Sequence, residues 1–489
     1  MLVHKFLIKT GSNALASVLS FVSLIVMTRY VGEEYGTMMW SWAFVGMFNA
    51  ISDLGFNSAN LKYIAKRDEN QNSYFTTFFV LKTGLSIIVM VVSLAACLIS
   101  IEGGAMGSEN LRICVIFSIY YIVYNIQTAI SVSFDGRLET GKASLLLAME
   151  AVVRSITLIA LALMQVDATL LSMGYIAGIA VSAISATYML HKSDLRFEKP
   201  RFFREYAVFA APLAFSIVSV CGIEYLDKVM VGMFGTSLDV GNYTASFGVV
   251  GAFTTLGTSL NNVLLPHLSR DEETAEERRQ TIWTVEKYIT LLILPVLTFI
   301  LVLGPAIGPV LFGKEYAESG DILSVQSVHI YAFIISGLMA QILYSINKSR
   351  LYLNGTIIFT IISLIGFVTL IPSSFGGLSM AGLGGVGAAC ALSISYVALA
   401  IFVSKAVKST TGIRFYPRIW RMFVSAIIQA VFIIALDTAF DIEGLLQLAF
   451  VGLVSEGVFL ASSYILGEFG KEEIRFVKLA LNPRMFKEN

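Results

Sequence analysis

Long uninterrupted apolar runs dominate this sequence, and they restrict the folds that it can adopt. A helix needs about 20 apolar residues to cross the roughly 30 Å hydrocarbon core of a bilayer. Backbone polar groups can be satisfied at that depth only in helices or closed barrels. Only 14% of the residues are charged and the mean hydropathy is +0.76. The sequence therefore predicts an all-α polytopic membrane protein.

The apolar runs predict about fourteen transmembrane helices. We expect them at residues 13–31, 37–56, 74–100, 110–134, 143–165, 168–190, 207–234, 242–266, 284–312, 321–346, 351–371, 379–404, 420–437 and 443–467.

Lysine and arginine indicate how these helices are oriented. The chain holds 34 basic and 34 acidic residues, so its net charge is zero. This balance gives no reason to expect a nucleic-acid partner, and it hides how the basic residues are distributed along the chain. Most of the basic residues fall in every second gap between the apolar runs. Cytoplasmic loops carry the excess of lysine and arginine. We therefore expect a multi-pass protein of the cell membrane with both termini in the cytoplasm.

A short pattern recurs in the two halves of the chain. The first span ends in Met27–Gly32 and the seventh in Met230–Gly235, and a charged stretch follows the next span in each half. Six spans separate the copies, so both halves cross in the same direction, as in a parallel repeat. We expect two six-helix bundles at 1–190 and 207–404, joined by a cytoplasmic linker at 191–206. Two additional helices and a cytoplasmic tail occupy 405–489.

These motifs carry a resemblance to a known family. Thr28–Gly36, Asp53–Phe56 and Leu61–Lys66 resemble the N-terminal signature of the polysaccharide transporter family, which includes O-antigen flippases. Asp227–Gly232 with Gly241–Tyr243 is similar to that family's seventh-span signature. The family lies in the superfamily that also holds MATE exporters and the lipid II flippase.

The resemblance implies a flippase that works by alternating access. Its cargo would be a polyprenyl diphosphate-linked oligosaccharide, moved from the cytoplasmic to the outer leaflet for surface polysaccharide or glycan assembly. A coupling ion, H⁺ or Na⁺, and polysaccharide assembly proteins are the further partners that it implies. Lipid II-handling relatives carry arginines in the part of the first span that holds residues 12–23 here, and this chain has none in that part, so a lipid II assignment is weakened.

Two ion pairs within predicted spans are candidates for the transport site. Charged groups inside a membrane usually face a bundle interior or a wet cavity. Glu150 precedes Arg154, and Glu224 precedes Lys228, each at the favourable i,i+4 spacing, with Asp227 beside the lysine. The pairs could simply neutralise themselves. Alternatively the bases bind the diphosphate, and the carboxylates support them or couple transport to protons.

Lys82 and Arg29 are the other substrate-binding candidates. Lys82 has no acid within one turn of its helix, so it must find a partner on another helix, reach the interface or meet cargo. Arg29, at the outer end of the first span, is either a helix-end anchor or a residue of the cavity mouth. The first span also carries a polar stripe that lines a passage or packs against a neighbour, at Ser12, Asn13, Ser17, Ser20 and Ser23.

No metal, cofactor or catalytic site is predicted. The four cysteines, Cys97, Cys114, Cys221 and Cys390, lie in apolar runs without CxxC spacing, which favours buried thiols. Gly382–Gly387 matches GxGxxG but opens an apolar span without a following acid. His329 and Glu456 are lone polar groups in spans, and we assign them no role.

Two other functions compete with the flippase. A MATE-like ion-coupled exporter of organic cations should present unpaired acids and aromatic residues in its cavity. A membrane glycosyltransferase or polymerase should carry a large outward loop, but the predicted outer gaps have the length of ordinary connectors. We therefore expect a transporter rather than an enzyme.

Overall fold

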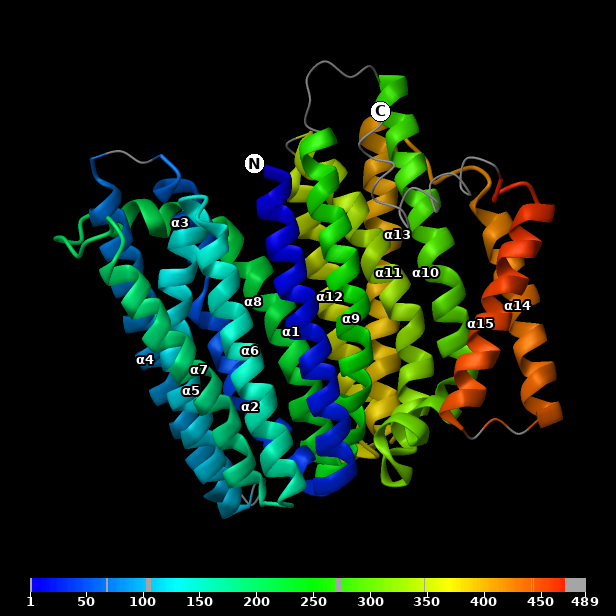
Figure 1. Cartoon of the computed structure of the whole chain (residues 1–489), viewed down its shortest axis with the longest axis horizontal. Coiled ribbons are helices and arrows are strands. Elements are labelled where there is room, and N and C mark those ends of the chain that lie inside the picture. The colour runs from blue at the N-terminus through cyan, green and yellow to red at the C-terminus, as the bar shows by residue number, and fades with distance from the viewer. Residues whose placement is uncertain are drawn as a thin grey trace. The chain divides into compact units, whose positions relative to one another are not determined.

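The protein is almost entirely helical in its computed structural model, which describes residues 2–66, 69–102, 107–268, 275–346, 348–440, 442 and 444–470 (Figure 1). The charged stretch at 269–272, residues 67 and 68 of the matching stretch, and the tail from 471 onwards lie outside the described residues.

The elements follow one another in this order: α1 (Leu2–Val31), α2 (Glu33–Asn49), η1 (Ala50–Ser52), α3 (Phe56–Ile64), α4 (Gln71–Glu102), α5 (Ser108–Gly136), α6 (Thr140–Leu163), α7 (Ala168–His191), α8 (Phe203–Phe234), α9 (Ser237–Leu268), α10 (Ala275–Phe312), η2 (Lys314–Tyr316), α11 (Glu318–Ser345), α12 (Ser349–Leu370), β1 (Ser374–Phe375), β2 (Leu378–Ser379), α13 (Gly384–Thr411), α14 (Ile419–Phe440) and α15 (Leu445–Ile465).

The described residues contain fourteen helices of 17 residues or more, which confirms the predicted fourteen long segments. Eleven of these helices are individually long and apolar enough to cross a membrane. The single sheet among the described residues is a two-residue antiparallel hairpin, with Ser374 opposite Ser379. The protein is therefore a multi-pass membrane protein of helices joined by short connectors.

The chain divides into two compact units. The first comprises residues 1–252 and 356–395, and the second comprises 253–355 and 396–489. The bounds of these units reflect which helices pack side by side. The bounds expected from the sequence reflect instead the repeated pattern in the two halves of the chain. The two six-helix bundles and the linker at 191–206 stay a prediction.

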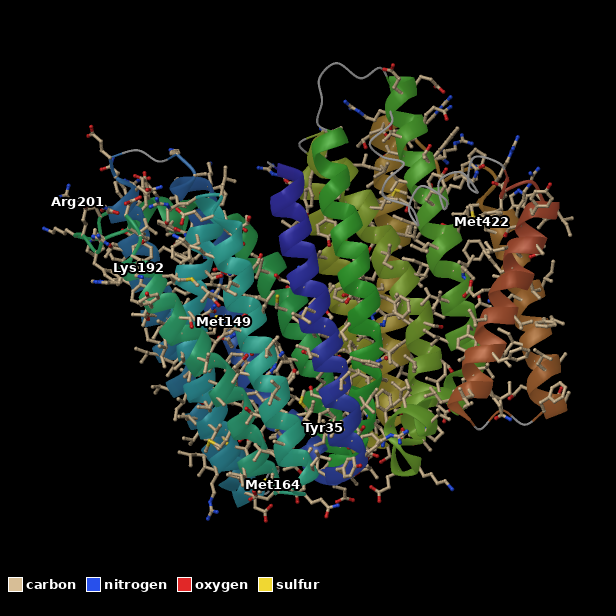
Figure 2. All side chains as sticks on the ribbon, in the orientation of Figure 1. Tyr35, Met149, Met164, Lys192, Arg201 and Met422 are labelled. Atoms are coloured by element: carbon tan, nitrogen blue, oxygen red, sulfur yellow. The ribbon has the colours of Figure 1, made fainter. Side chains whose placement is uncertain are left out.

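Within the first unit, α6 lies between α1 and α7, and α5 packs against α4 and α7 (Figure 1). Lys192 and Arg201 lie at one end of this unit, and Tyr35 and Met164 lie at the other (Figure 2). This separation agrees with the alternation of basic loops in the sequence. The basic segment after α7 and the connectors after α1 and α6 are on opposite faces.

The segment 191–206 is fixed along the start of α4. The Ser73 hydroxyl donates a 2.7 Å hydrogen bond to the carbonyl of Lys199, and the backbone N–H of Arg201 donates to Thr77 Oγ1 at 3.1 Å. The rings of Tyr74 and Phe202 stack with centroids 3.9 Å apart. This segment is therefore a packed strap rather than a loose connector.

The two copies of the repeated pattern meet within the first unit. Trp40 Nε1 donates a 3.1 Å hydrogen bond to the carbonyl of Val229, and Thr37 Oγ1 donates to Ser237 Oγ at 3.0 Å. A Cβ on Gly36 would collide with the backbone of Ser237, and one on Gly232 would collide with Trp40. Glycine is required at both positions because the helices approach so closely.

In the second unit, α14 and α15 pack on α10, which contains three prolines. Proline removes a hydrogen bond from a helix interior. The buried amide of Gln429 on α14 donates to the carbonyl of Pro295 at 3.2 Å. The buried Glu286 carboxylate of α10 accepts the backbone N–H of Tyr416 at 2.8 Å. The last two helices are thus attached to α10 by polar contacts as well as by apolar packing.

Candidate functional site

Arg154 lies in α6 and forms the ion pair that its spacing predicts. Its Nη1 is 3.1 Å from Glu150 Oε1. Its Nη2 donates a 3.0 Å hydrogen bond to Ser20 Oγ of α1, and its guanidinium carbon is 5.3 Å from the ring centroid of Tyr175 on α7. Three helices therefore fix the plane of this guanidinium, which keeps 20% of its side chain exposed.

A glycine allows α7 to approach this pair. A Cβ on Gly178 would lie 2.7 Å from the Cβ of Arg154 and 2.9 Å from the carbonyl oxygen of Glu150. These distances are shorter than van der Waals contact, so a larger residue would push α7 away from α6. Gly178 and Tyr175 were not singled out from the sequence, because nothing in the local pattern links them to α6.

Among the ion pairs of the described residues, Lys228 pairs with Asp227, the acid beside it in the sequence. The ammonium lies 3.1 Å from Asp227 Oδ1 and donates a 2.6 Å hydrogen bond to the backbone carbonyl of Glu224. Asp227 is fully buried, whereas the Glu224 side chain is exposed. A buried carboxylate loses more by lacking a counter-ion than an exposed one, so the lysine serves Asp227.

Aromatic residues of α9 complete the surroundings of Lys228. Its ammonium lies 4.1 Å from the ring centroid of Phe247, and the Tyr243 hydroxyl donates a 2.8 Å hydrogen bond to Asp227 Oδ2. Lys228 itself is only 5% exposed. It is therefore held much more tightly than Arg154.

Lys82 finds its partner in a family-signature motif. Its ammonium is 3.5 Å from Asp53 Oδ1, and the same oxygen accepts the backbone N–H of Asn57 at 3.0 Å. Leu54 and Gly55 both adopt positive φ, at 45° and 92°, in the turn before α3. Asp53 thus starts a helix and neutralises a buried lysine. Sequence analysis left Lys82 without a named partner because this contact joins separate helices.

Arg29 lies exposed in the last turn of α1. The three other candidate cations lie in the first unit, each beside a carboxylate of its own: Lys82 with Asp53, Arg154 with Glu150, and Lys228 with Asp227. In the described part of the chain, the arrangement is a set of separate ion pairs rather than one cationic cluster.

Tyrosines extend inward from Arg154. The ring of Tyr175 meets that of Tyr120 on α5 at 5.6 Å, edge to face, and Tyr120 stacks on Tyr124 at 5.9 Å. Gly46 of α2 leaves room for the Tyr121 hydroxyl, which would be 2.6 Å from a Cβ at that position. The guanidinium therefore borders an aromatic layer with polar edges.

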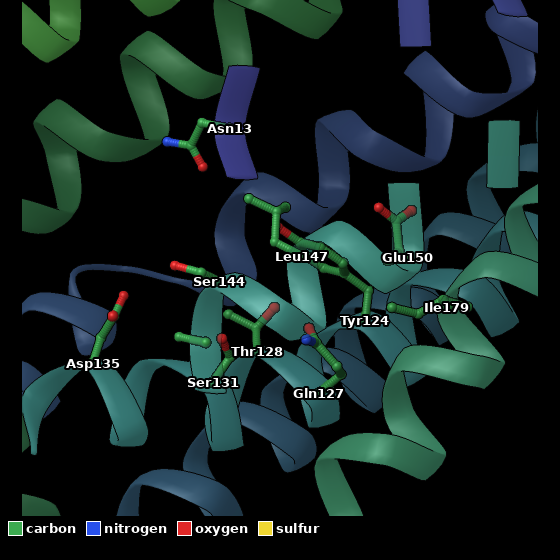
Figure 3. Close-up of a pocket in the computed structure, with 11 residues that line it drawn as sticks. Asn13, Tyr124, Gln127, Thr128, Ser131, Asp135, Ser144, Leu147, Glu150 and Ile179 are labelled. Atoms are coloured by element: carbon green, nitrogen blue, oxygen red, sulfur yellow. The ribbon is translucent and has the colours of Figure 1, made fainter. Parts of the chain in front are cut away.

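A pocket of about 190 Å³ lies beside this layer, wholly within the first unit (Figure 3). Helices α1, α5, α6 and α7 supply its walls. The lining residues are Asn13, Tyr124, Gln127, Thr128, Ser131, Asp135, Ala143, Ser144, Leu147, Glu150 and Ile179. Glu150 connects the pocket with Arg154.

The described residues contain no group of three or more His, Cys, Asp or Glu side chains placed to hold a metal ion. All four cysteines are free thiols; Cys97 and Cys114 are buried, and Cys221 and Cys390 are half-buried. His329 stacks on Tyr396 of the same unit, with ring centroids 5.1 Å apart.

Solved transporters share this fold. The lipid II flippase MurJ in an inward closed conformation superposes with a TM-score of 0.77, at 13% identity, over 94% of this chain and 98% of that one. An inward-facing MATE multidrug resistance transporter of the MOP superfamily gives a TM-score of 0.63, at 14% identity, over 81% and 94% of the two chains. The chain therefore has the same fold as these two transporters.

Sequence comparison identifies the family of the chain. The family model described as polysaccharide biosynthesis protein matches residues 26–321, and the protein belongs to this family. The probable low-salt glycan biosynthesis flippase Agl15 of Haloferax volcanii is 24% identical over 466 residues, which cover 90% of this chain and 91% of that protein. The resemblance drawn from the signature motifs is confirmed.

Proposed function

We propose that the protein is a flippase that moves a polyprenyl diphosphate-linked oligosaccharide from the cytoplasmic to the outer leaflet by alternating access. Membership of the polysaccharide biosynthesis family and the name of the haloarchaeal relative support this proposal. The protein acts in the cell membrane as a transporter rather than an enzyme, with both termini in the cytoplasm, as its basic loops predict.

The geometry of Arg154 carries the proposal. Guanidinium groups bind phosphate oxygens bidentately, and they do so most strongly where water is scarce. Ser20 and Tyr175 hold the group in place, while a fifth of its side chain stays accessible. A diphosphate could therefore replace Glu150 as the counter-ion without a large movement of the arginine.

The other candidates take secondary roles in this proposal. Lys82 and Lys228 would contact the diphosphate only after leaving Asp53 and Asp227, and Arg29 would meet it at the outer end of α1. The carboxylates of Glu150, Glu224 and Asp227 would hold the bases between transport cycles or carry a coupling proton. Burying a basic side chain without a carboxylate or a phosphate beside it costs a large desolvation free energy.

The direct test uses the full-length protein in proteoliposomes. The probe is a polyprenyl diphosphate disaccharide with a tritiated sugar, and translocation is measured as access of an impermeant glycosidase. Loss of charge-assisted hydrogen bonds worth about 1.5–3 kcal/mol predicts that Arg154→Ala slows flipping about 10- to 150-fold. Arg154→Lys keeps the charge but not the bidentate geometry, so its rate should lie between the two.

Arg112→Ala is the matched control, because Arg112 is exposed near the start of α5. Folded yield is followed by size-exclusion chromatography for every variant. Wild-type flipping in a well-folded Arg154→Ala protein would remove Arg154 from the site. A wild-type protein that does not accelerate translocation would refute the flippase assignment.

One observation favours an exporter of organic cations as the second candidate. Two carboxylates and Tyr124 line the pocket, and no lysine or arginine is among the described residues of the lining. The same proteoliposomes are therefore assayed for ion-driven ethidium movement. Ethidium transport without lipid translocation would favour the exporter.

A further inference from the structure

Helix α5 presents an unusual polar face for a helix that crosses a membrane. Tyr124, Gln127, Thr128, Ser131 and Asp135 follow i,i+3,i+4,i+7 spacing and then continue one more turn. Residues at this spacing share one face of a helix. All five line the pocket described above, so this face points into it rather than into lipid (Figure 3).

The facing wall comes chiefly from α6. Ser144 and Glu150 lie on it, and Asn13 of α1 contributes an amide from a third helix. Ser144 is 4% exposed, and within the described residues its hydroxyl oxygen is buried without a hydrogen-bond partner. Gln127 is 7% exposed. Buried polar groups normally find partners, so an unpaired hydroxyl in a pocket indicates a ligand or water that binds there.

The chemistry of the lining selects a class of ligand. Hydroxyl and amide side chains both donate and accept hydrogen bonds, and carboxylates accept them. Sugar hydroxyl groups need this mixture, and the ring of Tyr124 can cover a sugar face. A phosphate needs cations or several donors, but the described residues that line the pocket include no basic side chain, and an alkyl chain would leave the polar groups without partners.

We infer that this pocket is a carbohydrate subsite, which takes an uncharged sugar next to the diphosphate while Arg154 binds the phosphate. The inference rests on the proposed function and assigns a part of the same site. Glu150 joins the two parts, because it lines the pocket and pairs with Arg154 one turn further along α6.

The size of the pocket limits how much of the glycan it receives. Its volume of about 190 Å³ is below the roughly 300–1,000 Å³ of pockets that enclose a whole drug-sized ligand. It holds a portion of an oligosaccharide, such as one sugar ring. Asp135, in the last turn of α5, lies about 16 Å along the helix from Tyr124 at 1.5 Å per residue. The glycan therefore extends toward the end of the unit where α5 finishes.

Charge sets the specificity of this subsite. A sugar that carries a carboxylate would meet Glu150 next to the diphosphate, or Asp135 further along α5, and the described lining holds no cation to offset the repulsion between like charges. Neutral sugars avoid this repulsion and keep their hydrogen bonds. Glu150 thus excludes an acidic sugar at the position nearest the diphosphate, and Asp135 disfavours one further along the glycan.

Binding to the full-length protein in nanodiscs tests the inference by calorimetry. Three probes share a short prenyl diphosphate: one without a sugar, one with a neutral hexose and one with a hexuronic acid. The wild type should bind the hexose probe at least about tenfold more tightly than either other probe. Gln127→Met and Ser144→Ala should each reduce the ratio of hexose to sugarless affinity by about two- to tenfold, because each removes a neutral hydrogen bond.

Glu150→Gln should reduce the discrimination between hexose and hexuronic acid, because Glu150 is the lining carboxylate beside Arg154. Thr157→Val is the matched control, since the Thr157 hydroxyl of α6 is bonded to the carbonyl of Val153 and lies outside the lining. Its affinity ratio should equal that of the wild type. Unfolding temperatures confirm that every variant is folded.

The outcomes separate this inference from the proposed function. A wild-type protein that binds the sugarless and hexose probes equally overturns the carbohydrate subsite and leaves the flippase intact. Failure to bind any of the three probes counts against the flippase itself. Tetraphenylphosphonium binding that depends on Gln127, with no preference for the hexose, would also overturn the sugar assignment and indicate an organic-cation pocket.

Discussion

Replacing Gly36 with alanine should open the contact between the two copies of the repeated motif. Gly36 lies in the first turn of α2, and a Cβ there would overlap the carbonyl of Ser237 at the start of α9. The opposing atoms belong to the backbone, so no rotamer change relieves the overlap. Overpacking of this kind costs about 1–3 kcal/mol. The closed contact should therefore become about 5- to 150-fold less populated relative to the open one.

Crosslinking across that contact measures the shift. The hydroxyl oxygens of Thr37 and Ser237 are 3.0 Å apart, so the pair Thr37→Cys and Ser237→Cys should form a disulfide quickly under mild oxidation. Adding Gly36→Ala should slow this reaction by the same 5- to 150-fold if closure precedes oxidation. Flipping should slow as well, because a transporter that closes poorly at one end cannot complete its cycle.

Gly222→Ala is the control, since a Cβ at that position of α8 meets nothing within 4 Å. It adds the same methyl group to another helix without a clash. An unchanged crosslinking rate in the Gly36→Ala protein, equal to that of the Gly222→Ala protein, would refute the steric reasoning.

Three further predictions concern buried polar groups and close packing. Lys228→Met leaves Asp227 buried without its cation and should lower the free energy of unfolding by about 3–5 kcal/mol. The double variant Asp227→Asn/Lys228→Met should recover most of this loss. Equal unfolding temperatures for the single and double variants would contradict this prediction. Gly178→Ala should displace α7 from Arg154 and slow flipping. Gly141→Ala is its control and should leave the flipping rate unchanged, because a Cβ on Gly141 has no neighbouring atom within 4 Å. Similar flipping rates for the two variants would show that the close approach of α7 is unimportant. Burial raises the pKa of Tyr416 to about 12 from its usual 10.0, so the unfolded chain loses this proton at a lower pH than the folded one. The stability of the fold should therefore fall as the pH rises from about 10 to about 12. Tyr416→Phe should weaken this pH dependence, and an identical pH profile of unfolding temperature in the variant would contradict the prediction.

Sequence patterns predicted the helices well because spans and topology depend on local composition. Fourteen long helices and the Glu150–Arg154 pair both follow from regular spacing within single segments. The stripe on the first span was noticed, but its use was left open. Ser20 binds Arg154 and Asn13 lines the pocket, so parts of that stripe do face polar partners.

The partners that come from distant segments could not be predicted in this way. Asp53 reaches Lys82 because η1, which it follows, packs against α4. The sequence places both Asp227 and Glu224 within one helical turn of Lys228, and only burial distinguishes Asp227 as the acid that forms the ion pair. Burial and approach distance decide these contacts, and neither is visible in one sequence. The polar residues of α5 are regularly spaced in the sequence, but from the sequence they were assigned only to a transmembrane span.

The residues of the signature motifs stabilise the fold of this protein. Gly36 and Gly232 allow neighbouring helices to approach closely, and Asp53 accepts a hydrogen bond from the first turn of α3 while it neutralises Lys82. None of the three lines the pocket. Relatives found through these motifs will therefore share a way of folding and closing, whatever glycan they carry. The cargo of each should instead be compared through the residues at positions 124, 127, 128, 131 and 135, which can change without disturbing the scaffold.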